Sequence, residues 1–469
     1  MTGGHDGIHA SLRDAEPSVF WLDTSASPEP RDPISACTET DLLIVGGGFT
    51  GLWAALQAKE RDPDRDVVLV EADTIAAHAT GRNGGFCDAS ITHGLHNAVA
   101  HFPKEAKRLV ELGRENFAAI ETAIDRYSID AAFDHSGGLS VAYEPWQLRE
   151  LESGIALERE HGETVELLDR DAMQSLVHSP TYIGGVRTAE GVATLDPARL
   201  AWGLADVAES LGVRIFEGTR IDSLEPMANA VVAETRRNRI RARKVVLGTN
   251  ALSHLVGATR RRVVPVWDYV LVTEPLTEAQ LASIGWRGRE GIGDAANQFH
   301  YYRLTPDNRI LWGGYDAIYF RGGDISDARF QRMETFDLLA RHFFATFPQL
   351  DGLQFTHRWG GVIDTSSRFC VTFGTAHDRR VSYAVGYTGL GVAATRFGAR
   401  VALDLVDDPT SDLLRLEFVR SRPFPFPPEP LRNVVIQMTR RAIANADNNE
   451  GRRGPWLRLL DAFGVGFDS

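Results

Sequence analysis

Residues 41–56, DLLIVGGGFTGLWAAL, decide the fold. The apolar run at 41–45 is short and rich in branched side chains, as in a buried parallel strand. A helical pattern follows from Leu52 to Glu60. Between them, Gly46-x-Gly48-x-x-Gly51 has the spacing of a dinucleotide-binding turn, in which the three glycines permit the tight turn, the approach of a pyrophosphate and close helix–strand packing. We therefore predict that a pyrophosphate lies at the N-terminus of this helix, where free N–H groups favour an anion.

A second apolar strand, 67–70, ends at Glu71, which completes a βαβ unit. At this spacing, the Glu71 carboxylate is expected to accept hydrogen bonds from the adenosine ribose. The glycine motif alone does not separate FAD from NAD.

Two further glycine-rich segments favour FAD. Thr80-Gly81-Arg82-Asn83-Gly84-Gly85 exposes backbone N–H groups about ten residues after the second strand. Gly386-Tyr387-Thr388-Gly389-Leu390-Gly391 enters a helix near the other end of the chain, and its positive end would stabilise negative charge on a reduced flavin ring. A ligand that contacts all three segments must be long, as FAD is.

The remaining pattern predicts a Rossmann-like α/β domain at both ends of the chain with an α+β insertion. Helices are expected at 103–127, 145–161, 196–211 and 392–406, and strands at 213–217, 231–234, 245–249 and 381–385. Between 262 and 375 the strands alternate or are aromatic, at 263–273, 299–304, 310–314 and 355–363, with a helix at 327–347, which indicates an antiparallel sheet. The predicted parts are an N-terminal arm (1–38), a discontinuous FAD-binding domain (39–110, 180–260 and 355–410), a substrate domain (111–179 and 261–354) and a C-terminal helical tail (411–469).

Composition excludes several classes of function. The 469 residues carry 50 basic and 63 acidic side chains, a net charge of −13, which disfavours nucleic-acid binding. In the basic run 236–244, arginines alternate with other residues, a pattern typical of a strand with one solvated face. Three scattered cysteines and no C-x-x-C pair predict neither disulfides nor a metal site. No secretory leader and no long apolar run is present, so a cytoplasmic protein is expected. The loosened glycine pattern at 291–296 lacks a preceding apolar strand and is interpreted as a loop.

Six segments together resemble the D-amino-acid-oxidase-like (DAO) superfamily of FAD oxidoreductases, and most closely its gamma-glutamylputrescine oxidoreductase branch. They are DLLIVGGGFTGLWAAL, TGRNGGFCDASITHG, GVATLDPARLAWGLA, HYYRLTPDNRILWGG, RWGGVIDTSSRFC and GYTGLGVAATRFGARVALDL, which span about residues 20 to 410. The resemblance implies a FAD domain covered by the sheet of a substrate domain. It also implies hydride transfer to flavin N5 from a C–H bond next to an amine nitrogen.

The resemblance also implies the site residues. The catalytic candidates are His93, Tyr302 and Trp359; on the strand at 299–304, either Tyr301 and Arg303 or His300 and Tyr302 face the flavin. No metal is expected, and FAD is expected to be non-covalent, with Cys87 and Cys370 as buried thiols. The candidates for holding FAD are Gly46, Gly48, Phe49, Thr50, Gly51, Glu71, Ala72, Thr80, Gly81, Arg82, Asn83, Gly84, Gly85, Ile221, Thr249, Asn250, Gly361, Thr388, Gly389, Gly391 and Val392.

Two departures from the family pattern bear on the substrate and the oxidant. Relatives that oxidise small amino acids hold the substrate carboxylate with an arginine where this chain has Ile363, although Arg358 or Arg368 could compensate. Several amine-oxidising relatives use a lysine above the flavin for reaction with oxygen, and no lysine follows Lys244 here. The electron acceptor is therefore either oxygen or another molecule.

We favour the interpretation that the protein oxidises an amine to an imine, which then hydrolyses to an aldehyde. The favoured substrate is a gamma-glutamylputrescine-like primary amine. The alternatives are a secondary N-methyl amine, an amino-acid oxidase or dehydrogenase, and a tailoring flavoenzyme of secondary metabolism. A pyridine-nucleotide-linked flavoprotein is less favoured because it requires a second dinucleotide fingerprint. The oligomeric state stays open.

The tail after the proline-rich break at 423–430 has apolar stripes at helical spacing, among them Leu431, Val434, Val435 and Met438. Arginines surround these stripes, a pattern that a membrane-surface helix shares. We expect the tail to dock on its own domain rather than on a membrane or a partner subunit.

Overall fold

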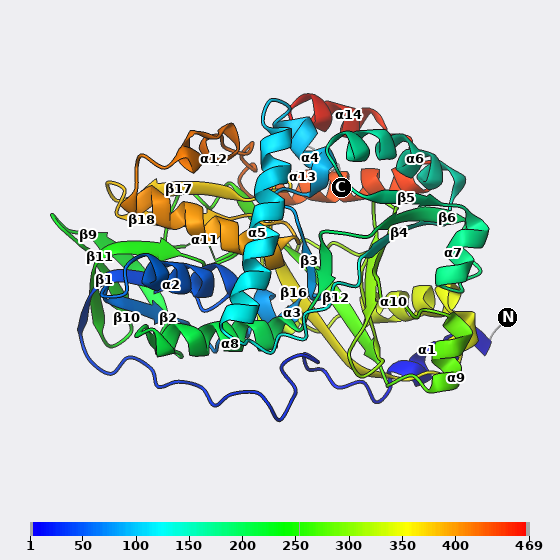
Figure 1. The fold of residues 1–469 in the computed structure, drawn as a ribbon, viewed down its shortest axis with the longest axis horizontal. Helices are drawn as coiled ribbons and strands as arrows, with labels where there is room; N and C mark the ends of the chain where they lie inside the picture. Colours follow the sequence, from blue (N-terminus) through cyan, green and yellow to red (C-terminus); the bar gives the residue numbers. More distant parts are fainter. Residues whose placement is uncertain (1–2, 253, 466–469) are drawn as a thin grey trace.

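The computed structural model describes residues 3–252 and 254–465, which build two eight-stranded sheets side by side and one two-stranded sheet (Figure 1). The first sheet has the strand order β17-β18-β11-β1-β2-β8, and β10 and β9 extend it from β11. Its members are β1 (Thr38–Val45), β2 (Val67–Val70), β8 (Arg214–Phe216), β9 (Ile221–Pro226), β10 (Val231–Thr235), β11 (Arg239–Leu247), β17 (Thr372–Ala376) and β18 (Val381–Val385).

The central strands of the first sheet are parallel, because helices return the chain to the same end of the sheet before the next strand begins. β1 pairs in parallel with β2 and β11, and β11 with β18. One face is covered by α2 (Phe49–Arg61), α5 (Ala106–Arg126), α8 (Pro197–Ser210) and α11 (Gly391–Asp407), which share one apolar core. The Asp196 side chain caps α8 by accepting hydrogen bonds from the N–H groups of Ala198 and Arg199.

The second sheet is antiparallel except where β13 pairs in parallel with β4. Its order is β16 (Phe355–Ser366), β12 (Val263–Thr273), β15 (Ile310–Gly314), β14 (His300–Leu304), β13 (Gly291–Asp294), β4 (Gly138–Ala142), β6 (Gly184–Thr188) and β5 (Val165–Leu168). Helix α10 (Met333–Thr346) packs on it through buried aromatic side chains. The predicted fold class, a Rossmann-like domain with an inserted antiparallel sheet, is confirmed.

Smaller elements connect the sheets. β3 (Phe86–Asp88) and β7 (Val192–Thr194) form the two-stranded sheet, and α3 (Ala79–Arg82) and α4 (Gly94–His101) flank β3 in sequence. The remaining elements are α1 (Gly3–Leu12), α6 (Pro145–Glu160), α7 (Arg170–Leu176), α9 (Glu278–Ile284), η1 (Asp327–Arg329), η2 (Pro348–Leu350), η3 (Asp412–Arg415), α12 (Glu417–Arg420), α13 (Leu431–Asp447) and α14 (Pro455–Ala462).

Several expected positions need correction. β16 and β6 were assigned to the FAD-binding domain, but they pair in the second sheet, β16 with β12 along its whole length. Conversely, α5 belongs to the core of the first sheet rather than to the substrate domain. Residues 291–294 form a strand, not a loop, because β4 and β14 supply hydrogen-bonding neighbours that no local pattern reveals. The helix expected at 327–347 is split into η1 and α10.

The N-terminal arm contains a short helix, α1, that the sequence did not predict, and then runs beneath both sheets (Figure 1). Two apolar side chains of the arm, Val19 and Trp21, are buried, with Trp21 3% exposed. In β11 the side chains of Arg239, Arg241 and Arg243 are exposed and the intervening ones buried, which confirms the solvated face. Within residues 3–252 and 254–465, no helix is long and apolar enough to cross a membrane.

Candidate active site

A cavity of about 1310 Å³ lies at the carboxyl ends of β1 and β11 and extends to the second sheet. β1 is the strand at which the order of the first sheet reverses, and open α/β sheets bind ligands at that point. The volume exceeds the range of roughly 300–1,000 Å³ usual for one drug-sized ligand, so a long cofactor and a second molecule have room together.

The glycine turn forms the floor of this cavity. Gly46 has φ of +114°, and a Cβ there would lie 2.4 Å from the carbonyl oxygen of Gly248. A Cβ at Gly48 would lie 2.8 Å from Oγ1 of Thr80, and one at Gly51 only 1.9 Å from the carbonyl oxygen of Gly46. The three glycines thus permit the tight turn, the close approach of a pyrophosphate and the close packing of helix against strand, for which the motif needs glycine.

Two helix N-termini face the same cavity. Gly48 caps α2 and Leu390 caps α11, neither with a capping hydrogen bond from its own side chain, although Oγ1 of Thr80 accepts a hydrogen bond from the Phe49 N–H at 3.0 Å. Both residues line the cavity, 342 positions apart in the chain. Two positive helix ends in one cavity suit the pyrophosphate and the polar flavin edge of FAD, so the residues present fit this cofactor.

Glu71 has a structural partner that the motif does not reveal. Its Oε2 accepts a hydrogen bond from the N–H of Gly47 at 2.6 Å, and its Oε1 accepts one from Asp73 at 2.9 Å. The carboxylate therefore fixes the glycine turn while it lines the cavity. Its contact with the ribose stays a prediction.

The turn at 82–85 is held from both sides by tryptophans. Nε1 of Trp359 donates to the carbonyl oxygen of Arg82, and Nε1 of Trp21 donates to that of Asn83, both at 2.9 Å. The Arg82 guanidinium donates to the Gly360 carbonyl and lies 4.0 Å from the centre of the Phe330 ring, and desolvation lowers its pKa to about 10. Trp359 does not line the cavity, so it positions this turn instead of touching a ligand.

Most of the expected cofactor residues line the cavity. Three do not: Gly51, Gly81 and Gly85. A Cβ at Gly81 would lie 2.3 Å from the Ala76 carbonyl oxygen, and one at Gly85 2.1 Å from that of Leu195. These glycines therefore permit backbone packing rather than ligand contact. Those that line it are Gly46, Gly48, Phe49, Thr50, Glu71, Ala72, Thr80, Arg82, Asn83, Gly84, Ile221, Thr249, Asn250, Gly361, Thr388, Gly389, Gly391 and Val392.

Of the catalytic candidates, His93 alone lines the cavity. It precedes α4 and packs edge-on against Phe369. Burial lowers the pKa of its imidazole to about 4, partly offset by a hydrogen bond with the backbone of Thr388, so the ring is neutral at physiological pH.

The strand at 300–304 presents Tyr301, not Tyr302, to the cavity. The Tyr302 hydroxyl forms a hydrogen bond of 2.6 Å with that of Tyr182 inside the second core, so the structure removes Tyr302 from the reaction site. Arg303 shares the face of Tyr301, but it is buried and donates to the Leu195 carbonyl at 2.7 Å.

Asp268 on β12 is the residue that sequence reasoning missed. Its carboxylate lines the cavity and accepts a hydrogen bond from the Tyr301 hydroxyl at 2.5 Å. Desolvation raises its pKa to about 6, although hydrogen bonds to Tyr301 and the backbone oppose the shift. Within the described residues, no arginine, lysine or histidine forms a salt bridge with it. A single acid in the apolar strand VVPVWDYVLVT was the available signal.

Asp88 is a second carboxylate in the cavity, and desolvation also raises its pKa to about 6. Ile363, at the position where the family resemblance predicts an arginine in oxidases of small amino acids, also lines the cavity. The proposed substitutes are held elsewhere: Nε of Arg358 donates to the Ala15 carbonyl at 3.1 Å, and Nη1 of Arg368 donates to Ser421 Oγ at 2.7 Å.

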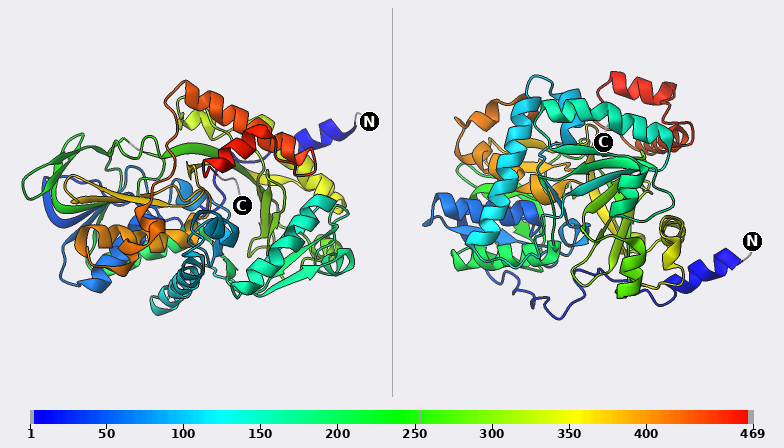
Figure 2. Two further views of the ribbon diagram at one scale, coloured as in Figure 1. Left: turned by 90° about the horizontal axis from the view of Figure 1, so that it is seen from above. Right: turned by 45° about the vertical axis from the view of Figure 1, so that its right-hand side comes forward.

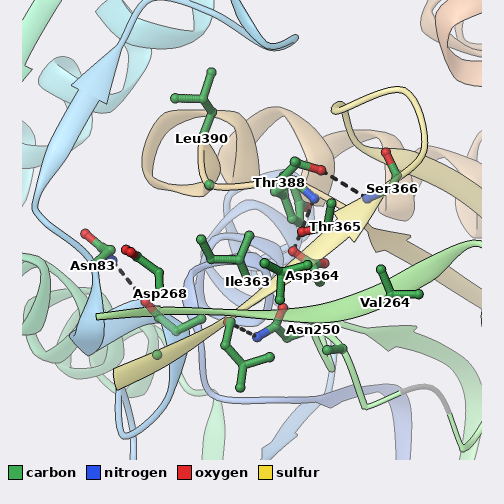
Figure 3. A pocket seen from close by; sticks show the side chains of 18 of the residues that line it. Asn83, Asn250, Val264, Asp268, Ile363, Asp364, Thr365, Ser366, Thr388 and Leu390 are labelled. Carbon is green, nitrogen blue, oxygen red and sulfur yellow. Dashed lines mark hydrogen bonds between the residues drawn. The ribbon is translucent and has the colours of Figure 1, made fainter. Parts of the chain in front are cut away.

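The approach to α11 is fixed by a buried acid, Asp364. Its carboxylate accepts hydrogen bonds from the N–H groups of Gly386 at 2.5 Å and Tyr387 at 3.2 Å, and burial raises its pKa to about 7. Thr388 adds a hydrogen bond of 3.1 Å from the Ser366 N–H to its Oγ1. Figure 3 shows this group on one side of the cavity, with Asn83 and Asp268 on the other.

The two buried cysteines lie outside the cavity lining. Burial raises the thiol pKa of both Cys87 and Cys370. A protonated thiol away from the ligand is poorly placed for a flavin linkage, so non-covalent FAD stays our prediction. In the part of the chain that the structure describes, no group of three His, Cys, Asp or Glu could hold a metal.

Comparisons with known proteins agree with this site. Gamma-glutamylputrescine oxidoreductase of Escherichia coli is 31% identical over 416 residues, 87% of this chain and 93% of that protein, and a probable oxidoreductase of Haemophilus influenzae is 26% identical over 82% and 87%. The fold matches glycine oxidase from Geobacillus kaustophilus with a TM-score of 0.65, at 19% identity over 82% of this chain and 99% of that one. The model of the FAD-dependent oxidoreductase (DAO) family matches residues 41–405. The chain belongs to this family of FAD-dependent oxidoreductases.

Proposed function

We propose that this oxidoreductase oxidises an amine and not an α-amino acid. The observation that carries the proposal is that Asp268 and Ile363 line the same cavity. Asp268 is a carboxylate that forms no salt bridge among the described residues, and Ile363 is apolar. A buried carboxylate without a cationic partner favours a cationic ligand, because an unpaired charge in a cavity is costly. A site for an amino-acid carboxylate would need a cation where Ile363 stands.

When bound, FAD supplies at flavin N5 the acceptor for a hydride from the C–H bond next to the amine nitrogen. Asp268 binds the ammonium group and directs it into the cavity, and the Tyr301 hydroxyl keeps the carboxylate oriented. The nitrogen must lose a proton before its lone pair can form the C=N bond, and the carboxylate is placed to take that proton. Loss of the hydride from the neutral amine leaves a protonated imine, which water hydrolyses to an aldehyde and ammonium.

A gamma-glutamylputrescine-like primary amine is the first substrate to test, on the strength of the E. coli relative. A secondary N-methyl amine comes second, since its nitrogen is also cationic. Amino-acid oxidation and a tailoring reaction remain the alternatives; glycine oxidase and L-proline dehydrogenase are among the structures that share the fold. A pyridine-nucleotide partner is least favoured, because residues 291–294 form a strand in the second sheet.

The electron acceptor is proposed to be oxygen or a second, unidentified acceptor. The chain has no lysine after Lys244, so the second sheet supplies no ammonium group to promote reaction with oxygen. We further propose that the first sheet with its helices is the FAD-binding domain, and that the second sheet is the substrate domain.

The choice between amines and amino acids is tested by anaerobic bleaching of bound FAD. Simple primary amines should bleach it faster than glycine, sarcosine or D-alanine do, because only the amino acids bring a carboxylate to Ile363. Stopped-flow absorbance with equal concentrations gives the rates. Faster bleaching by the three amino acids would refute the assignment.

A further inference from the structure

The C-terminal tail, residues 424–465, forms one wall of the reaction cavity. Figure 2 shows α13 and α14 lying together next to the second sheet. Glu429 accepts a hydrogen bond from the Tyr319 hydroxyl at 2.5 Å, and Asp447 accepts bonds from the N–H groups of Asn297 at 2.9 Å and Gln298 at 3.0 Å. These bonds fix the tail on its own chain, in agreement with the docking expected from sequence.

The side of the tail that faces the cavity is apolar. Its lining residues include Phe426, Ile436, Ile443, Trp456, Leu460 and Phe463. Most are only half-buried, because they face the cavity rather than a packed core. Exposed apolar surface of this kind, continuous with a reaction site, marks a ligand-binding surface.

Most polar groups on this wall have partners within the protein, although Nε of Arg440 is buried without a hydrogen-bond partner among the described residues. Thr439 donates to the Val435 carbonyl at 2.9 Å and accepts from Nε1 of Trp456 at 3.0 Å. Arg440 is the one charged side chain among the described tail residues that line the cavity, and it forms an ion pair with Asp316. The tail therefore offers a ligand neither a free charge nor a free hydroxyl.

The segment between β15 and α10 contributes aromatic side chains to the same cavity, among them Tyr315, Tyr319 and Phe330. The cavity thus has a carboxylate, Asp268, at one place and an apolar, aromatic-lined space at another. We propose that the tail selects amines that carry a bulky apolar group, with the nitrogen at Asp268 and the apolar body against α13 and α14. This inference rests on the proposed amine oxidation, and it disfavours the polar gamma-glutamyl head.

The test compares n-butylamine, 4-phenylbutylamine and gamma-glutamylputrescine as substrates of the full-length holoenzyme. Each buried methylene is expected to raise kcat/KM by roughly fourfold, so 4-phenylbutylamine should exceed n-butylamine by at least about tenfold. Ile443→Asn and Trp456→Ala should each lower kcat/KM several-fold more for 4-phenylbutylamine than for n-butylamine, which removes most of that advantage. Two variants keep the test valid if one of them fails to fold.

Val434→Asn is the matched control, because Val434 lies on the same helix, α13, but is 50% exposed and outside the cavity. It should leave the preference for 4-phenylbutylamine unchanged. A higher kcat/KM for gamma-glutamylputrescine than for 4-phenylbutylamine, or an equal loss for both alkylamines in the two cavity variants, would overturn the proposal while leaving amine oxidation intact. Failure of every amine to bleach the FAD would instead refute the proposed function itself.

Discussion

Gly48→Val should purify as a folded protein without FAD. The backbone at Gly48 has φ of −87° and ψ near 180°, a conformation open to valine, so the fold should survive. The branched side chain, however, would point at Oγ1 of Thr80, 2.8 Å from its Cβ, and into the path of the pyrophosphate. It would also cover the N-terminus of α2, where an anion is expected to bind. The ratio of flavin to protein absorbance measures the loss.

Gly7→Val provides the control for this substitution. Gly7 is exposed on α1, and a Cβ there would meet nothing within 4 Å. This variant should keep the wild-type FAD content. Full FAD occupancy in Gly48→Val would show that the cofactor does not bind along the glycine turn.

Asp268→Asn should lower kcat/KM for a primary amine by roughly 10- to 150-fold. The substitution keeps the size of the side chain and removes the charge that pairs with the ammonium. A hydrogen bond to a charged group is worth about 1.5–3 kcal/mol, and about 1.4 kcal/mol corresponds to tenfold. FAD content should be unchanged. Asp351→Asn, at an exposed acid outside the cavity lining, is the control and should retain wild-type kinetics.

The same carboxylate predicts the acid limb of the pH profile. Desolvation raises the pKa of Asp268 to about 6, so the carboxylate predominates above that pH and is protonated below it. Binding of the cationic amine should therefore weaken as the pH falls through about 6, and kcat/KM should fall with it. Asp268→Asn should lack this limb. An unchanged limb in the variant would assign the titration to another group, such as Asp88.

The parts of the site that follow one another in the chain could be predicted from sequence. The glycine turn, Glu71 and the turn at 82–85 were found because each lies at a fixed distance from a strand or helix end. The fold class could be predicted for the same reason, because the spacing of apolar runs along the chain distinguishes parallel from antiparallel segments.

What depends on distant neighbours could not be predicted. Period-two alternation puts Tyr301 and Tyr302 on opposite faces, but the choice between the faces depends on β12 and β15. The role proposed for Asp268 depends on Ile363, which β16 places in the same cavity. The membership of β16 and β6 in the second sheet could not be predicted, because strand pairing, not sequence order, assigns a strand to a sheet.

The most direct test of amine oxidation in this cavity is anaerobic single-turnover kinetics with a primary amine, unlabelled or deuterated at the carbon next to nitrogen. Hydride transfer from that carbon predicts that deuterium slows the bleaching of FAD, and that aldehyde forms in an amount equal to the FAD bleached. Bleaching by NADH or by α-amino acids, with no response to any amine, would contradict it.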